Sequence, residues 1–139
     1  MKIKVKKLND SAVIPKYAKD GDAGMDLTCV SRVFTDKYIE YKTGLAFEIP
    51  EGYVGLLFPR SSISNKDLYL SNAVGVLDSG YRGEVTFRFK TTDAYGSFYK
   101  EGERVGQIIV IPHPKIEFIE SNELTDTDRG VGGYGSTGK

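Results

Sequence analysis

The sequence predicts an all-β domain built as a sandwich, a jelly roll or a barrel, and three observations predict it. Many short runs either alternate apolar and polar residues or are rich in β-branched and aromatic residues, as β-strands are. Turn-forming triplets such as Asp20-Gly-Asp, Pro50-Glu-Gly and Lys100-Glu-Gly stand between these runs. Helical periodicity is sparse. Many short strands at this spacing are typical of the three architectures.

The expected elements can be taken in chain order. In Ile3–Lys6 lysine alternates with apolar residues, and in Glu84–Lys90 apolar residues stand at every second position. The full set of expected strands is Ile3–Lys6, Met25–Val30, Tyr38–Tyr41, Leu45–Ile49, Tyr53–Phe58, Glu84–Lys90, Val105–Ile111 and Ile116–Ile119. One short helix is expected over Ser61–Lys66, after Pro59. The stretch Asn72–Gly83 has an apolar middle interrupted by glycine, which indicates a hairpin whose backbone approaches something closely.

Composition excludes several classes of protein. The chain has 139 residues, which suits one domain with a real core, and its 19 Lys and Arg balance its 19 Asp and Glu. A nonspecific nucleic-acid binder would carry a basic surplus, so we expect no nucleic-acid partner. The single cysteine, Cys29, rules out a disulfide within the chain, and one histidine leaves too few ligands for a Cys/His zinc site. The amino-terminal residues lack a signal-peptide core and no run reaches transmembrane length, so we expect a cytoplasmic protein with no membrane partner.

The last eleven residues, Arg129–Lys139, carry the strongest functional signal. Five of the eleven are glycine, which leaves the backbone free and its amide groups accessible. Two cations and a Ser-Thr pair can bind phosphate, and Tyr134 can stack on a base. We interpret the segment as a lid that orders over a nucleotide with several phosphates, against the alternative of a disordered polar terminus. The strand pattern ends near Asn122, so we divide the chain into a domain of residues 1–121 and an arm of residues 122–139.

Five short motifs, in fixed order, resemble those of the homotrimeric dUTP pyrophosphatases, the dUTPase family. They are Ala23–Leu27 (AGMDL), Pro59–Ser62 (PRSS), Asn72–Gly83 (NAVGVLDSGYRG), Gly102–Gln107 (GERVGQ) and the tail Arg129–Gly138. The resemblance implies a jelly-roll-like β-barrel with a flexible glycine-rich arm, and hydrolysis of dUTP to dUMP and pyrophosphate. It also implies a homotrimer in which the arm of one chain closes over a site built by the others.

The resemblance assigns roles to two residues of the third motif. Asp78 is the candidate general base, since attack on the α-phosphorus needs a water whose proton a carboxylate can accept; the alternative is that Asp78 only stabilises a turn. Tyr81 is expected to pack under the deoxyribose and exclude a 2′-hydroxyl, and its alternative is a core tyrosine.

The base and the phosphates are assigned to other residues. The hairpin is expected to present backbone groups of Asn72, Gly75 and Val76 to the edge of uracil, with Gly75 permitting the close approach. The Asn72 side chain either binds the base or braces the turn. Arg60, Ser61 and Ser62 are expected to bind phosphate, the alternative being a surface arginine with a serine helix cap. The commonest family form has glycine at the position of Ser62, so this serine fits only if its backbone needs no positive φ.

The remaining expected roles belong to Gln107 in the fourth motif, to Asp26 in the first motif and to the arm. Gln107 is expected to face a phosphate or the attacking water, or else to point outward from its strand. Asp26 is expected to support the phosphate site, and Arg104 to be structural. In the arm, the phosphates are assigned to Arg129, Ser136 and Thr137, and the base to Tyr134 with its neighbour Gly135. Mg²⁺ is expected through the substrate phosphates and water, with no direct protein ligand.

Three other readings compete. The related dCTP deaminases share the barrel, but the Asp-Ser-Gly-Tyr run and the tail have the hydrolase form. A nucleotide sensor or partner-binding protein on this scaffold is a second reading, and the intact Asp78 and tail favour catalysis. A plain β structural module leaves the tail and the Asn72 segment unexplained. The segment Thr91–Tyr99 has no assignment and is richer in aromatics than a solvent loop.

Overall fold

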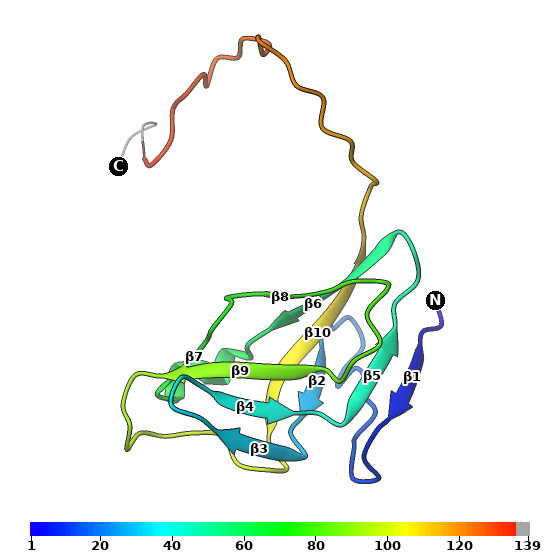
Figure 1. Cartoon of the computed structure of the whole chain (residues 1–139), viewed down its shortest axis with the longest axis vertical. Coiled ribbons are helices and arrows are strands. Elements are labelled where there is room, and N and C mark those ends of the chain that lie inside the picture. The colour runs from blue at the N-terminus through cyan, green and yellow to red at the C-terminus, as the bar shows by residue number, and fades with distance from the viewer. Residues whose placement is uncertain (136–139) are drawn as a thin grey trace.

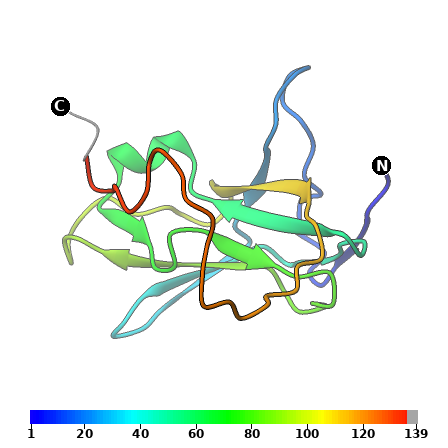
Figure 2. The same cartoon turned by 90° about the horizontal axis from the view of Figure 1, so that it is seen from above.

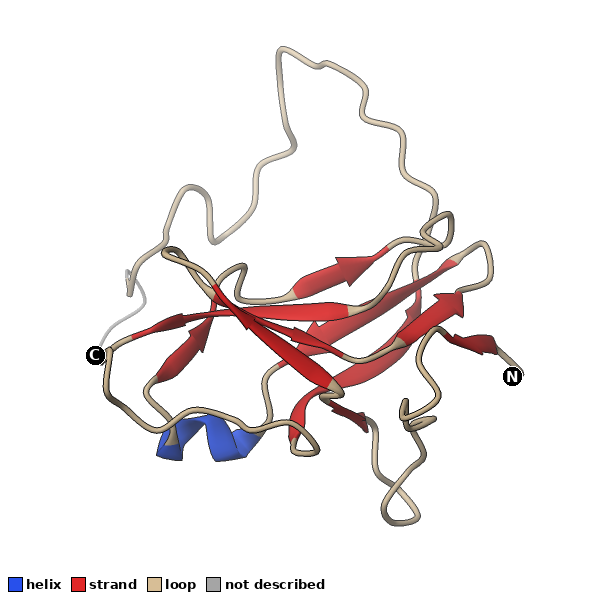
Figure 3. Cartoon of the chain, turned by 60° about the horizontal axis from the view of Figure 1, so that its bottom comes forward, coloured by secondary structure: helices blue, strands red, loops and turns tan. Residues whose placement is uncertain are grey.

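A computed structural model describes residues 1–135 of the chain. Within them the fold is built from β-strands, with a single short 3-10 helix (Figures 1 and 3). The strands are β1 (Lys4–Lys7), β2 (Met25–Thr28), β3 (Ser31–Phe34), β4 (Ile39–Lys42), β5 (Leu45–Glu48), β6 (Tyr53–Phe58), β7 (Leu68–Leu70), β8 (Gly75–Leu77), β9 (Thr86–Thr91) and β10 (Arg104–Pro112), and the helix is Ser61–Asn65. The expected all-β, jelly-roll-like fold is confirmed.

Two four-stranded antiparallel sheets form the body of the barrel, in the orders β2-β10-β6-β8 and β3-β4-β9-β7, and β1 pairs with β5. Most neighbours in these sheets are distant in sequence. Asp26 on β2, for example, pairs with Gln107 on β10. The order therefore brings the first, second and fourth sequence motifs to one sheet, because β2, β6 and β10 carry or precede them.

Alternation along the strands explains the core. On β9 Phe87 and Phe89 are buried whereas Arg88 between them is exposed, since successive side chains of a strand point to opposite faces. Tyr41 on β4 packs edge-on against Phe89, with 5.6 Å between ring centroids.

The buried Cys29 belongs to the same core, and burial raises the pKa of its thiol to about 11. The thiol is therefore protonated near neutral pH and is a packing group rather than a nucleophile.

Most of the strand predictions are confirmed to within two residues at each end, and Tyr53–Phe58 has the predicted bounds. The helix expected over Ser61–Lys66 is the 3-10 helix Ser61–Asn65. The short strands β3 and β7 were missed. Each lies at the edge of its sheet and has only three or four residues, too few for alternation to be distinguished from chance.

Two predictions are wrong. The run Ile116–Ile119 is not a strand, because it finds no hydrogen-bonding partner within residues 1–135, and its Phe118 side chain is 93 % exposed. The stretch Asn72–Gly83 is not a two-stranded hairpin: β8 lies in one sheet and pairs with β6, whereas β7 and β9 on either side of it pair with each other in the opposite sheet. The chain crosses between the sheets there, which local sequence cannot reveal.

An extended arm leaves the barrel after β10. The last backbone bond from this end to the barrel joins the amide of His113 to the carbonyl of Gly52, at 2.9 Å. From there to Gly135 the chain is almost entirely exposed and arcs away from the sheets (Figure 1), so that in the view from above it passes across them (Figure 2). The chain therefore leaves the sheets well before Asn122. In the described part of the chain, no helix has the length and apolar character needed to cross a membrane.

Candidate active site

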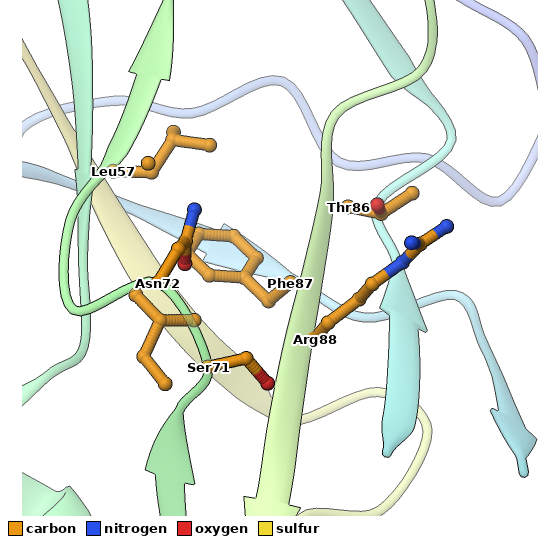
Figure 4. A pocket seen from close by; sticks show the side chains of 8 residues that line it. Leu57, Ser71, Asn72, Thr86, Phe87 and Arg88 are labelled. Atoms are coloured by element: carbon orange, nitrogen blue, oxygen red, sulfur yellow. The ribbon is translucent and has the colours of Figure 1, made fainter. Parts of the chain in front are cut away.

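A cavity opens between β8 and β9, where the two sheets diverge. It has two chambers of about 340 and 190 Å³. Both are lined by Leu57, Asn72, Gly75 and Thr86. The larger chamber extends toward Arg88 (Figure 4), and the smaller one adds Val76, Asp78, Tyr81 and Glu84 to the wall. The structure thus places six residues of the third motif around one cavity: Asn72, Gly75, Val76, Leu77, Asp78 and Tyr81.

The turn before β8 fixes the position of Asn72. Ala73 has a φ of 59°, a conformation uncommon for a residue with a side chain. The amide of Ala73 donates to the carbonyl of Leu70 at 3.1 Å, and the amide of Val74 donates to that of Asn72 at 2.6 Å. Backbone strain of this kind persists where the surrounding structure over-determines it, often at binding sites. Gly75 permits the backbone of β8 to approach Leu57 closely. A Cβ atom added at position 75 would lie 3.0 Å from the Cβ of Leu57.

A second turn presents Asp78 and Tyr81 at the mouth of the smaller chamber. The Tyr81 amide donates to the carbonyl of Asp78 at 3.1 Å, and its hydroxyl donates to the carbonyl of Glu84 at 3.0 Å. The guanidinium of Arg82 donates to the carbonyls of Ser79 and Tyr81, which closes the turn. The Asp78 side chain is exposed and accepts no hydrogen bond from any described residue. Asp78 therefore does not brace the turn through its carboxylate, which is free to act on a ligand.

A cluster of charged and polar side chains lies on a different surface. The Arg60 Nε donates to Asp26 Oδ1 at 2.7 Å, and an Arg104 guanidinium nitrogen lies 3.1 Å from Asp26 Oδ2. A second Arg60 nitrogen donates to the hydroxyl of Ser62 at 3.3 Å. Gln107 is half-buried and donates from its amide to the carbonyl of Pro59 at 3.2 Å. Asp26 therefore pairs with both Arg60 and Arg104 within the chain.

Position 62 accommodates serine without strain. Within residues 1–135, Ala73 and Tyr134 are the non-glycine residues with positive φ, and Ser62 is not one of them. The condition stated for this departure from the family pattern is therefore met. Ser61 begins the 3-10 helix, with Arg60 at its N-cap position.

The cavity and the charged cluster are separate surfaces of the chain. Gln107 pairs with both Asp26 and Phe58, and the next rung joins Ile108 to Leu57, which in turn pairs with Gly75. Adjacent rungs point to opposite faces, and Leu57 and Ile108 point inward. Asp26 and Gln107 thus face away from the cavity wall that Leu57 and Gly75 form, and they line a pocket that Asp78 does not line. Within residues 1–135, no residue of the charged cluster lines the cavity of Asp78.

The arm residues stand apart from both sets. Arg129 donates only locally, to the carbonyl of Gly132 at 3.1 Å. Tyr134, with a φ of 52°, is fully exposed, as is Gly135. Ser136 and Thr137 lie outside the described residues. Thus no described arm residue joins either group within the chain.

Three residues that the sequence analysis did not select also belong to these surfaces. Thr86 and Arg88 line the cavity, and Tyr99 touches the charged cluster through Ser62. Thr86 and Arg88 could have been found as the polar positions of the alternating run Glu84–Lys90. Tyr99 gave no signal, because it follows an irregular loop.

The donor set fits a magnesium ion held by a ligand rather than by a protein cage. Among the described residues no three His, Cys, Asp or Glu side chains gather as a metal site would require. Both oxygens of Asp26 already face guanidinium groups. Asp78 and Glu84 are the carboxylates that line the cavity, and a Mg²⁺ ion held by substrate phosphates and water needs neither of them as a direct ligand.

Comparison with known proteins identifies the family. The dUTPase family model matches residues 10–138. The chain is 43 % identical to the deoxyuridine 5′-triphosphate nucleotidohydrolase of Nautilia profundicola, over the full length of both, and 39 % identical to that of Hydrogenobaculum sp., over 99 % of each. The dUTPase of Staphylococcus bacteriophage 80alpha, solved with dUPNHPP, superposes with a TM-score of 0.84 at 29 % identity, covering 99 % of each chain. A mutant dUTPase of phage phi11 of S. aureus, described as showing the coordination of a structural Mg(II) ion, has a TM-score of 0.74 at 25 % identity and covers 88 % of this chain and 98 % of its own. The five motifs, the barrel and these matches together show that the chain belongs to the dUTPase family.

Proposed function

We propose that this protein hydrolyses dUTP to dUMP and pyrophosphate, which removes dUTP from the DNA precursor pool and supplies dUMP for thymidylate synthesis. Its family and the names of its relatives support the reaction. The observation that carries the proposal is the Asp78 carboxylate, which is exposed, unpaired among the described residues, and part of the wall of a cavity of about 190 Å³.

The cavity supports selection of a deoxyuridine nucleoside. Backbone groups of Asn72, Gly75 and Val76 would meet the edge of uracil, where a mismatched buried polar group costs about 1–3 kcal/mol. Tyr81 would pack against the deoxyribose. Its hydroxyl is anchored to the Glu84 carbonyl, so the ring cannot move aside for a 2′-hydroxyl. A fixed wall excludes a larger sugar more strongly than apolar character alone.

In the proposed reaction, Asp78 accepts a proton from a water molecule as the water oxygen attacks the α-phosphorus. The bond from that phosphorus to the oxygen that bridges it to the β-phosphorus breaks, and pyrophosphate leaves with the bond's electron pair. A positioned base of this kind contributes about 10²–10⁴-fold to the rate. Arg60 and Gln107, with Ser61 and Ser62, would bind the phosphates. Bound Mg²⁺ would neutralise charge on the phosphate oxygens.

The separation of the two residue sets supports a homotrimer with shared sites. Asp78 lines one pocket, whereas Asp26 and Gln107 beside Arg60 line another, so a site that uses all of them would draw on more than one chain. A neighbouring chain would supply the charged cluster. The exposed arm, with Arg129, Tyr134, Gly135, Ser136 and Thr137, would close the site of a neighbour.

The direct test is pyrophosphate release from dUTP with Mg²⁺, beside dCTP, dTTP and UTP. It would be run on the full chain and on a chain ending at Asp128. We expect turnover of dUTP alone, and its loss on truncation. Ammonia release from dCTP would make the protein a deaminase, and binding of nucleotides without turnover would make it a sensor. Light scattering that showed an active monomer would contradict the shared site.

A further inference from the structure

Tyr99 is a buried tyrosine whose hydroxyl faces the charged cluster. The residue is only 2 % exposed and stands between the loop after β9 and the start of β10. Its hydroxyl oxygen lies 3.4 Å from Ser62 Oγ. A buried tyrosine hydroxyl normally has a hydrogen-bond partner, and among the described residues Ser62 is the one found.

The ring of Tyr99 is held firmly. It packs against Tyr41 and Phe89, with centroids 6.0 and 5.9 Å away, and the Lys66 ammonium lies 5.1 Å from its centroid. Its carbonyl accepts hydrogen bonds from the Arg32 guanidinium at 2.7 Å and from the Tyr41 hydroxyl at 3.3 Å. The Tyr99 hydroxyl is thus a fixed point that belongs to the core, not to the surface.

Ser62 connects this fixed point to Arg60. Its hydroxyl accepts a hydrogen bond from one Arg60 nitrogen at 3.3 Å, while Arg60 Nε donates to Asp26 at 2.7 Å. A hydroxyl has one proton and two lone pairs, so Ser62 can bond to Arg60 and Tyr99 at once. The guanidinium is then held on one side by a carboxylate and on the other by a serine that the core positions. The family form with glycine at position 62 has no hydroxyl with which to make this link.

We propose that Tyr99 is a positioning residue that acts through Ser62 to orient the Arg60 guanidinium for the phosphates of the substrate. The proposal rests on the proposed function for the identity of that substrate. The link fixes one edge of the guanidinium and leaves its remaining N–H groups for a phosphate oxygen. Ser62 is therefore more than a tolerated substitution: together with Tyr99 it supplies a hydroxyl pair that holds Arg60.

The test compares Tyr99→Phe, which removes only the hydroxyl, with Tyr53→Phe as a matched control. Tyr53 begins β6 and packs half-buried against the core, and its hydroxyl makes no hydrogen bond to any described residue. We expect Tyr99→Phe to lower kcat/KM for dUTP by about three- to tenfold, the usual weight of one hydrogen bond, with unchanged inhibition by deoxyuridine. Tyr53→Phe should leave kcat/KM unchanged. Equal values for Tyr99→Phe and the unmodified chain would overturn the proposal.

A double variant examines the route through Ser62. Ser62→Ala should lower kcat/KM at least as much as Tyr99→Phe, and combining the two should cost no more than Ser62→Ala alone, because both break one chain of contacts. Losses that multiply in the double variant would show that Tyr99 acts by another route.

A measurement without substrate separates this inference from the proposed reaction. The NMR signal of the Arg60 N–H group that donates to Ser62 should shift, and its exchange with solvent should accelerate, in Tyr99→Phe but not in Tyr53→Phe. An unchanged signal would contradict the link even if dUTP is hydrolysed. A chain that fails to hydrolyse dUTP but shows the shift would retain the link and lose the proposed function.

Discussion

Tyr81 and Tyr134 are both expected to touch the nucleoside, yet they stand in opposite kinds of structure. Tyr81 is 45 % exposed and is fixed by its hydrogen bond to the Glu84 carbonyl, inside a turn that Arg82 closes. Tyr134 is fully exposed on an arm that makes no packing contact with the barrel along most of its length. The barrel side of the site is therefore held by hydrogen bonds within the chain before a ligand arrives. The arm gains its contacts only on closure, and binding must supply the cost of ordering it.

The largest expected effect comes from the barrel side. Asp78→Asn should lower kcat for dUTP by about 10²–10⁴-fold, because the amide cannot accept the proton of the attacking water. Binding of the nonhydrolysable analogue dUPNHPP, measured by calorimetry, should persist because the cavity is intact. Asp36→Asn, at an exposed turn between β3 and β4, is the matched control and should be fully active. Near-normal turnover by Asp78→Asn would remove Asp78 from the mechanism.

The next largest effect concerns the arm, and it is measured as the dUTP hydrolysis recovered when two inactive variants are mixed. A chain ending at Asp128 retains Asp78 but lacks the end of the arm, and full-length Asp78→Asn has the reverse defect. If the arm serves a neighbour, co-refolding equal amounts should restore about a quarter of the sites, because random trimers combine the two intact parts at that frequency. Mixing Asp78→Asn with a truncated Asp78→Asn chain is the control. No recovery in the first mixture would mean that each arm closes the site of its own chain.

The smallest expected effect is on the free energy of unfolding, and it compares side-chain packing in the barrel with packing in the arm. An added Cβ at Gly106 on β10 would overlap the Phe87 ring, whereas at Gly133 in the arm it would meet nothing within 4 Å. Gly106→Ala should lower the free energy of unfolding by about 1–3 kcal/mol, as overpacking does. Gly133→Ala should change it by less than about 0.5 kcal/mol. Urea denaturation measures the free energy of unfolding of both variants. If Gly133→Ala lost as much of it as Gly106→Ala, the arm would have to pack against the barrel.

The sequence predicted most strands because their buried positions alternate locally, as Phe87 and Phe89 do around Arg88. It failed at Ile116–Ile119, where the alternation is present but residues 1–135 contain no partner strand for it. It also failed at the crossing from β7 to β8, where the sheet that a segment joins depends on distant strands. The five motifs and their order predicted which residues belong to the candidate site. They did not predict which of these residues lie beside one another.

The sequence by itself determined the all-β class, the family motifs and the chemical type of each candidate side chain, because these depend on residue identity and spacing. Only the tertiary structure decided that Asp78 and Asn72 share a cavity while Asp26 and Gln107, with Arg60 bound to Asp26, lie at a separate pocket. It also decided that Tyr99 touches Ser62, although 37 positions separate them. The physical reason is that strand pairing joins segments distant in sequence, and a shift of one rung reverses the face on which a side chain lies.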